Sequence, residues 1–370
     1  MSTKSCMGCG IELQNLDINK EGYTPKKISD GEEMYCQRCF QLKHYGKYSI
    51  NKLTRDDYRR EVNELLNKVE LVLPVFDIIH FESSFDDEIL DVLREKDSII
   101  VINKLDLIPT DKHPSEVANW VKERLAEEGI APLDIAIVSS KNGYGINGIY
   151  KKIKHFFPNG VKGMIIGVTN VGKSSIVNRL IGKKIVTVSK YPGTTLKNVL
   201  NMIPFTNIGL YDTPGLIPDG RISDLLCDSC AQKTVPSTEI SRKTFKTGKN
   251  RVIMLGNLLE FRILNSEEVK PIFTVFAAKD IPFHETNKEK SLELNKINYF
   301  DIPCKHCREK YNSYKKEKKT LTINAGEELV FKGLGWLSVK RGPLKIEITI
   351  PEYVELINRK AFIDPRRKRS

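Results

Sequence analysis

The chain has 370 residues, enough for about two or three domains, and its 40% hydrophobic and 29% charged residues are ordinary for a globular protein. The opening MSTKSCMGCG lacks the apolar run of a signal peptide, and the most apolar stretch, 69–81, is too short to span a bilayer, so we expect a cytoplasmic protein with no membrane partner. The net charge of +12 indicates either a solvated basic surface or a surface for a polyanion such as nucleic acid.

The first segment, residues 1–48, has too little apolar periodicity to bury a core of its own. All eight cysteines of the chain fall into four Cys-x-x-Cys pairs, two of them in this segment. Disulfides are not expected without secretion, and this spacing suits tetrahedral zinc. We therefore expect a four-cysteine zinc finger over 1–48, with Cys6, Cys9, Cys36 and Cys39 as ligands.

Residues 49–221 alternate between strand and helix patterns. Helices are predicted at 56–70, 114–129, 145–157 and 173–182, and strands at 70–78, 98–104, 133–140, 163–168 and 208–215. Alternation with short connections predicts an α/β domain with a parallel sheet covered by helices on both faces.

A phosphate-binding loop is predicted at 167–174, where GVTNVGKS stands between a strand and a helix. Glycines let backbone N–H groups surround a phosphate, the lysine supplies a cation, and the serine hydroxyl binds Mg²⁺. Seven residues of this loop are expected to contact the nucleotide: Gly167, Asn170, Val171, Gly172, Lys173, Ser174 and Ser175.

Two segments downstream of this loop complete the predicted phosphate and metal site. Asp212 of DTPG (212–215) is expected in the Mg²⁺ shell, and the Gly215 N–H is expected to reach a γ-phosphate. PGTT (192–195) lies between the loop and DTPG, and Thr195 is preferred over Thr194 as the second hydroxyl ligand of Mg²⁺.

NKLD at 103–106 follows a strand and predicts guanine recognition. The Asp106 carboxylate can accept hydrogen bonds from guanine N1–H and the exocyclic amine, which discriminates against adenine by roughly 10⁴. Asn103 is expected at the N7/O6 edge and the Lys104 stem along the ring. SSK, with Ser139, Ser140 and Lys141, is expected beside O6. NKLD alone could be an ordinary turn, but the motifs together favour a GTPase.

The order of these motifs is inverted, because the guanine-binding motifs precede the phosphate-binding loop. A circular permutation explains this if residues 158–162 join the usual last helix to the usual first strand. The chain then leaves the GTPase domain just after DTPG, so whatever follows residue 222 is tethered to the segment that senses γ-phosphate.

Residues 222–370 carry Lys-rich segments between short apolar runs at 251–264, 271–278, 328–339 and 344–351, which predict a β-rich domain. The first and third runs share an apolar stretch followed by Gly and Leu, a weak indication of an internal repeat. Trp336 is either a core residue or a stacking surface. Four cysteines form either a second zinc site or two pairs of reduced thiols: Cys227, Cys230, Cys304 and Cys307.

CMGCGIELQ and CQRCFQLKHY, followed by the permuted motifs and FKGLGWLSV at 331–339, resemble the YqeH family of circularly permuted GTPases, bacterial ribosome-biogenesis factors. The resemblance covers almost the whole chain. It implies hydrolysis of GTP to GDP and phosphate during small (30S) subunit assembly, with a pre-30S particle, rRNA or a ribosomal protein as partner. It also implies a C-terminal domain that contacts RNA or protein, and we expect a monomer. The four C-terminal cysteines depart from the family pattern.

Hydrolysis is expected to be slow, because Leu216 stands where many GTPases place a glutamine that orients water. Asn170 occupies the position at which some GTPases similar to this one bind K⁺, which predicts K⁺-stimulated turnover; alternatively, Asn170 only bonds its own loop. The expected catalytic residues are therefore Lys173, Thr195, Gly215 and Asn170. Two other functions stay open: a zinc-dependent RNA-binding module with a slow regulatory nucleotide site and, least favoured, a GTPase that assists RNA modification.

Overall fold

The computed structural model describes residues 4–6, 11–18, 20–25, 28, 34–37, 39, 54–108, 113–182, 198–266, 268 and 270–362. The chain divides into two compact units. The first unit comprises Met1–Asp106 and Lys112–Pro218, and the second comprises Leu107–Asp111 and Asp219–Ser370. None of the described helices is both long and apolar enough to cross a membrane.

The first unit contains a six-stranded sheet in the order β3-β2-β1-β4-β6-β5. All neighbouring strands are parallel except β5, which is antiparallel to β6. This confirms the predicted parallel sheet; β5 was not predicted, because two of its four residues are exposed and it is not an apolar run. The strands are β1 (Leu71–Asp77), β2 (Ile99–Asn103), β3 (Asp134–Ile137), β4 (Val161–Ile166), β5 (Val199–Met202) and β6 (Ile208–Asp212).

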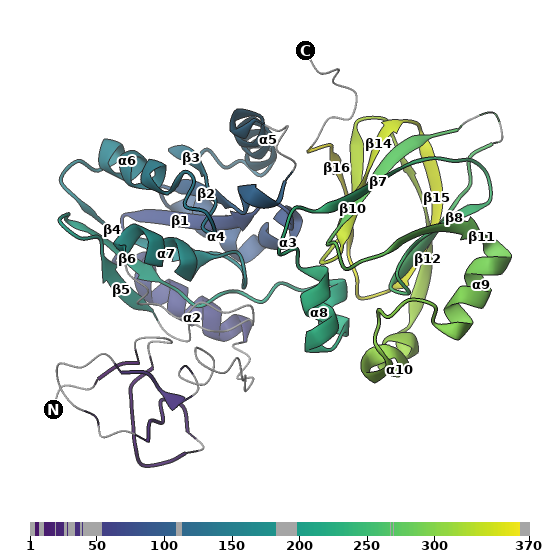
Figure 1. The fold of residues 1–370 in the computed structure, drawn as a ribbon. Helices are drawn as coiled ribbons and strands as arrows, with labels where there is room; N and C mark the ends of the chain where they lie inside the picture. Colours follow the sequence, from purple (N-terminus) through teal and green to yellow (C-terminus); the bar gives the residue numbers. More distant parts are fainter. Residues whose placement is uncertain are drawn as a thin grey trace. The chain divides into compact units, whose positions relative to one another are not determined.

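Helices surround this sheet (Figure 1). The four predicted helices are confirmed, two short helices at 81–84 and 87–95 were not predicted, and a 3₁₀ turn follows β2. The elements are α2 (Arg55–Leu66), α3 (Phe81–Ser84), α4 (Asp87–Glu95), α5 (Pro114–Glu127), α6 (Ile146–Phe156), α7 (Lys173–Ile181) and η1 (Leu105–Leu107). Every residue of β1 and β2 is buried, as expected for inner strands of a sheet covered on both faces.

The sheet order explains how a permuted chain builds one site. β4 precedes the phosphate-binding loop and lies between β1 and β6. NKLD and SSK follow β2 and β3 on one side of β4, and DTPG begins at the end of β6 on its other side. Because the carboxyl ends of parallel strands meet at one edge of a sheet, all four motifs lie along that edge. The fold is that of a circularly permuted P-loop GTPase domain.

The second unit consists of two five-stranded sheets with the orders β16-β13-β14-β10-β7 and β11-β8-β9-β15-β12. All its strand pairs are antiparallel, which confirms the predicted β-rich region. The strands are β7 (Ser241–Lys246), β8 (Arg251–Leu255), β9 (Leu259–Ile263), β10 (Ile272–Ala277), β11 (Phe283–Asn287), β12 (Lys316–Ile323), β13 (Glu327–Phe331), β14 (Gly335–Arg341), β15 (Leu344–Pro351) and β16 (Leu356–Lys360).

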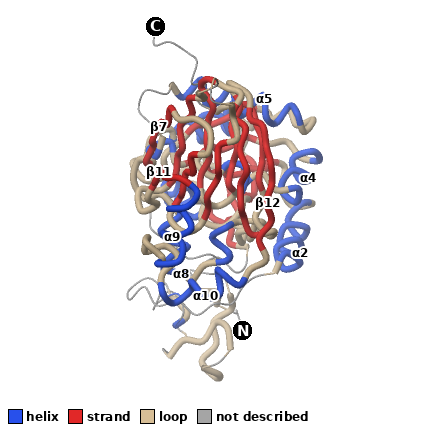
Figure 2. Tube along the Cα trace, turned by 90° about the vertical axis from the view of Figure 1, so that its right-hand side faces the viewer, coloured by secondary structure: helices blue, strands red, loops and turns tan. Residues whose placement is uncertain are grey.

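Helical elements of the second unit are η2 (Ile222–Leu225), α8 (Asp228–Thr234), α9 (Lys288–Ile297) and α10 (Lys305–Ser313). The labels of α8, α9 and α10 lie toward one end of the strands in both views (Figures 1 and 2). The apolar runs at 251–264 and 328–339 are each a hairpin of two strands, because three-residue turns interrupt them at 256–258 and 332–334.

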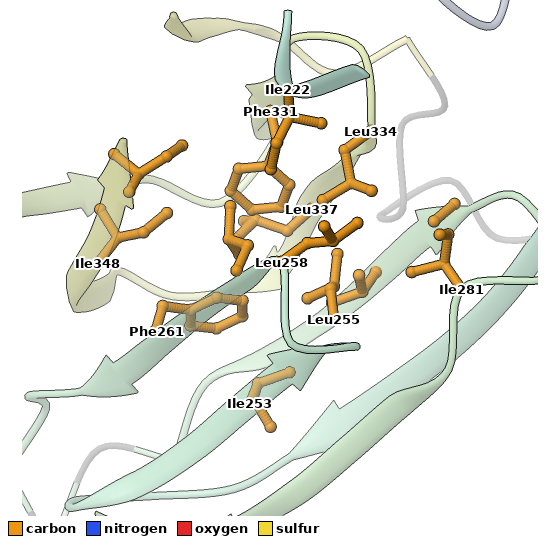
Figure 3. Close-up of a cluster of buried hydrophobic side chains, with 14 of the residues drawn as sticks. Ile222, Ile253, Leu255, Leu258, Phe261, Ile281, Phe331, Leu334, Leu337 and Ile348 are labelled. Carbon is orange, nitrogen blue, oxygen red and sulfur yellow. The ribbon is translucent and has the colours of Figure 1, made fainter. Parts of the chain in front are cut away.

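Apolar side chains from both sheets form the core of the second unit (Figure 3). Phe261 of β9 stacks with Phe331 of β13 at a centroid distance of 6.3 Å, which joins the two sheets. Trp336 is only 1% exposed and stacks on Phe276 at 4.8 Å. Trp336 is therefore a core residue, and the alternative of an exposed stacking surface is wrong.

Candidate guanine-nucleotide site

The phosphate-binding loop connects β4 to α7, and its backbone approaches the NKLD segment closely. Gly172 caps α7 with a left-handed backbone, at φ 99°. A Cβ on Gly172 would lie 2.3 Å from Asn103 Nδ2, so only glycine fits there. Asn170 is also left-handed, at φ 66°, a conformation that asparagine adopts more readily than most residues. The loop therefore curls as a phosphate-binding loop must.

Lys173, the first residue of α7, lies inside this loop. Its ammonium donates hydrogen bonds of 2.9 Å to the carbonyl oxygens of Gly167 and Val168. Burial lowers the pKa of Lys173 to about 8, while the nearby Asp212 carboxylate opposes this shift. Phosphate oxygens near this ammonium would favour its charged form, which fits the predicted role of Lys173 in binding phosphates.

Two of the three predicted Mg²⁺ ligands are in direct contact. The Ser174 hydroxyl donates a 2.8 Å hydrogen bond to Asp212 Oδ2, and Asp212 is fully buried at the end of β6. A hydroxyl and a carboxylate are the oxygen ligands that Mg²⁺ prefers, so this pair fits the ion. Thr195, and its alternative Thr194, lie outside the described residues.

Backbone hydrogen bonds join the DTPG segment to the phosphate-binding loop. Leu216 N donates to Gly167 O at 3.2 Å, and Thr169 N donates to Leu216 O at 2.8 Å. A Cβ on Gly215 would lie 2.9 Å from Lys173 Nζ, so the Gly215 backbone lies beside the lysine head. The Leu216 side chain is fully buried. Gly215 therefore lies beside the phosphate-binding loop, the Leu216 side chain points into the core, and the contact of Gly215 with a γ-phosphate stays a prediction.

The Asp106 carboxylate, which is predicted to select guanine, is held by the SSK segment. Ser139 Oγ donates a 2.6 Å hydrogen bond to Asp106 Oδ1, and Lys141 Nζ lies 3.9 Å from Asp106 Oδ2. Ser139 is fully buried, whereas the Lys141 side chain is 62% exposed. The two motifs that the sequence assigned to base recognition are thus adjacent, with the serine orienting the aspartate.

Asn103 connects the base-recognition segments to the phosphate-binding loop. Its Nδ2 donates to Val171 O at 2.7 Å and to Ser140 Oγ at 3.1 Å, and its Oδ1 accepts from Ser140 N at 2.9 Å. The side chain is 1% exposed. Bracing of these loops by Asn103 is a role that the sequence did not reveal, while its contact with the guanine N7/O6 edge stays a prediction.

The structure adds supporting residues that sequence reasoning missed. Asp77, at the end of β1, accepts a 2.7 Å hydrogen bond from Lys104 Nζ and lies 3.4 Å from His80 Nδ1. Burial alone would raise the pKa of Asp77, but Lys104 and His80 outweigh it and hold the pKa below its usual range. Arg179 of α7 donates from Nε to Ser140 O at 3.0 Å. No motif marked Asp77 or Arg179.

The described cysteines gather in two clusters. The sulfur atoms of Cys6, Cys36 and Cys39 lie within 4.8 Å of one another and are buried, and Cys36 N donates to Cys6 Sγ at 3.2 Å. Cys9 lies outside the described residues. The four C-terminal cysteines also lie within 4.8 Å of one another. Thiolate clusters of this kind fit Zn²⁺.

Comparison with known families identifies two regions of the chain. Residues 162–255 match the family model described as 50S ribosome-binding GTPase, and residues 270–362 match the model described as YqeH-like, C-terminal. The first region covers the phosphate-binding half of the first unit and continues into the second unit as far as the end of β8, and the second region covers β10 to β16 of the second unit.

Three known proteins are similar to parts or nearly all of the chain. YqeH of Bacillus subtilis is 28% identical over 366 residues, which cover 97% of this chain and 99% of that protein. NO-associated protein 1 of Arabidopsis thaliana is 28% identical, with 58% of this chain and 44% of that protein covered. Ribosome biogenesis GTPase A of Bacillus licheniformis is 32% identical, with 43% of this chain and 58% of that protein covered. The chain thus spans about half of the last two proteins.

A P-loop GTPase sheet, a YqeH-like C-terminal region and similarity to YqeH along almost the entire chain agree with one another. The chain is similar to YqeH along almost its entire length, and it is a P-loop GTPase of the ribosome-biogenesis type.

Proposed function

We propose that this protein is a monomeric, cytoplasmic switch that hydrolyses GTP to GDP and phosphate during assembly of the small (30S) ribosomal subunit. The observation that carries the proposal is the convergence of NKLD, SSK, the phosphate-binding loop and DTPG at one edge of the sheet. The hydrogen bond from Asn103 to Val171 fastens the base-recognition half of this site to the phosphate half.

Within this proposal, each half of the site has a distinct task. Guanine is bound by residues of two motifs: Asn103, Lys104, Asp106, Ser139, Ser140 and Lys141. Phosphates are bound by the loop and the start of α7, with Lys173 as the principal cation and the Gly215 N–H at the γ-phosphate. Ser174, Asp212 and Thr195 would hold Mg²⁺, which neutralises charge on the phosphate oxygens.

Slow intrinsic turnover follows from the position of Leu216. Its side chain is fully buried and has no hydrogen-bonding group, so it cannot orient an attacking water. The positive charge that stabilises the transition state of hydrolysis must then come from another group. We assign this role to K⁺ held by Asn170, whose left-handed backbone lies in the phosphate-binding loop.

An RNA-containing partner is supported by charge. The chain carries a net charge of +12. Two edge strands of the second unit, β7 and β12, are rich in cationic residues that are exposed or half-buried. The residues are Arg242, Lys243 and Lys246 on β7, and Lys316, Lys318 and Lys319 on β12. Cations on an accessible surface are the usual basis for binding phosphate backbones.

The test is cosedimentation with 30S subunits, pre-30S particles and 50S subunits in GDP, GTP and a non-hydrolysable GTP analogue. We expect nucleotide-dependent association with small-subunit particles and faster turnover in their presence. Binding without any stimulation of turnover would favour the zinc-dependent RNA-binding module instead. Association with 50S subunits alone would contradict the assignment to the small subunit.

A further inference from the structure

The second unit is built from two copies of one structural motif. The two sheets match strand by strand when the strand numbers are shifted by five. β11, β8 and β9 of one sheet correspond to β16, β13 and β14 of the other, and β15 and β12 correspond to β10 and β7. Each copy therefore runs through five strands, β7 to β11 and β12 to β16. In each copy the first and fourth strands join the sheet of the other copy.

Equivalent backbone hydrogen bonds support this correspondence. In the two hairpins, residues 76 positions apart make the same contacts. Asn250 N donates to Ile263 O at 3.0 Å, as Gly326 N donates to Val339 O at 2.9 Å. In the hairpin turns, Leu258 N donates to Leu255 O at 3.2 Å, as Leu334 N donates to Phe331 O at 2.9 Å. Leu258 and Leu334 both enter the core (Figure 3).

The contact between each hairpin turn and the last connection of its copy is repeated as well. Gly256 N donates to Pro282 O at 2.9 Å, and Lys332 N donates to Glu355 O at 3.2 Å. These agreements extend over both copies, so the weak sequence indication of a repeat corresponds to a structural duplication.

The cysteine pairs belong to the same duplication. Cys227 precedes α8 and Cys304 precedes α10, and each helix leads into the first strand of its copy. The two cysteines have matching backbone angles, φ −71° and ψ 159° for Cys227, φ −69° and ψ 166° for Cys304. Cys230 and Cys307 are then the equivalent buried residues of the first helical turn.

The two pairs meet in a geometry suited to a metal. Cys227 Sγ lies 3.6 Å from Cys304 Sγ, and Cys304 Sγ lies 3.8 Å from Cys307 Sγ. Four sulfurs around Zn²⁺ at about 2.3 Å are about 3.8 Å apart at the corners of a tetrahedron. A disulfide would require about 2.05 Å. In addition, Cys304 N donates to Cys230 Sγ at 3.2 Å, and such N–H donors stabilise thiolates.

We propose that Cys227, Cys230, Cys304 and Cys307 bind one Zn²⁺ in a closed tetrathiolate centre to which each structural repeat contributes two ligands. With four protein ligands the centre has no open coordination position, so its role is structural. It joins α8 to α10, and thus the beginnings of the two repeats. The proposal rests on the second unit alone and is independent of nucleotide binding.

Zinc stoichiometry tests the centre directly. We expect about two equivalents of zinc per native chain, and about one in the double variant Cys6→Ser/Cys36→Ser, which retains only the proposed centre. Cys230→Ser/Cys307→Ser should also retain about one, at the N-terminal site, with GDP affinity unchanged. Ser229→Ala, between two proposed ligands, is the matched control and should keep both ions.

If Cys230→Ser/Cys307→Ser fails to fold, Cys6→Ser/Cys36→Ser still tests the proposed centre. Reconstituted with Co²⁺, it should show the absorption of tetrahedral cobalt thiolate. A quadruple variant that also carries Cys230→Ser and Cys307→Ser should lose that absorption. Less than about a tenth of an equivalent of zinc in Cys6→Ser/Cys36→Ser, or oxidised cysteines in its second unit, would overturn the proposal.

Discussion

Asn103 Nδ2 donates a 2.7 Å hydrogen bond to the carbonyl oxygen of Val171, 68 residues further along the chain. This bond joins the segment that is predicted to select the base to the loop that is predicted to hold the phosphates. It fastens the two halves of the proposed nucleotide site to each other.

Asn103→Ala should weaken GDP binding by about tenfold or more, because it removes hydrogen bonds to Val171 and Ser140 worth about 1 kcal/mol each. Isothermal titration calorimetry measures the change. Asn103→Asp keeps an acceptor for Ser140 N but loses the donor to Val171, so it should also weaken GDP binding if the bond to Val171 matters. Unchanged affinity in Asn103→Ala would show that the two halves of the site do not depend on this bond.

Asp106→Asn should move the base preference from guanine toward xanthine, because the amide can donate to the xanthine carbonyl where the carboxylate accepted from guanine. We expect GDP affinity to fall by at least about a hundredfold and XDP to become the tighter ligand. Competition binding with both nucleotides measures this. Retention of full GDP affinity would remove Asp106 from the base-binding site.

Asp77→Asn should destabilise the first unit by about 2–4 kcal/mol at pH 7, because it breaks a largely buried pair with Lys104. The folded-state pKa of Asp77 is lowered, so its contribution is present above the ordinary value of 3.8 and is lost as pH falls through the folded-state pKa. The difference from the native protein in urea unfolding should therefore shrink below about pH 4.

The exposed Asp91→Asn serves as the control for this series and should change stability by less than about 0.5 kcal/mol. A cost of Asp77→Asn that stays constant down to pH 3 would contradict the proposed ion pair with Lys104.

Leu216→Gln should not accelerate hydrolysis, although it restores the residue type that many GTPases use there. The Leu216 side chain is fully buried, so the glutamine amide would have to be desolvated in the core, at a cost of about 1–3 kcal/mol. Single-turnover rates and urea unfolding measure the two effects. Leu200→Gln, at an exposed position, is the control for stability. A faster variant would show that this side chain can reach the attacking water.

Turnover should be at least about tenfold faster in KCl than in NaCl at matched ionic strength, because K⁺ supplies charge that an arginine supplies elsewhere. Asn170→Ala should abolish the difference without preventing GDP binding. Choline chloride provides the cation-free baseline. Equal rates in the two salts would eliminate the monovalent-cation site.

The sheet of the first unit was predictable because its inner strands are unbroken apolar runs and its motifs stand at their ends. The supporting contacts were not, because they join distant residues of common types. Asp77 and Lys104, or Arg179 and Ser140, carry no spacing that links them in sequence.

For the second unit, the sequence predicted a β-rich domain but not its individual strands. Its edge strands β7 and β12 are mostly polar, and all but one residue of each strand is exposed or half-buried, so they lack an apolar signal. The hairpin turn at Gly256 was contained within one apolar run, which concealed two strands. The pairing of Cys227 with Cys304 depends on strands exchanged between repeats, which spacing alone cannot reveal.

Calorimetric titration of the purified, zinc-loaded protein with GDP, GTP, ADP and ATP tests the central claim most directly. If the permuted segments form one guanine-nucleotide site, GDP and GTP should each bind at a single site, and the adenine nucleotides should bind at least about 10³-fold more weakly. Failure to bind GDP or GTP, or equal affinity for ATP, would contradict this account.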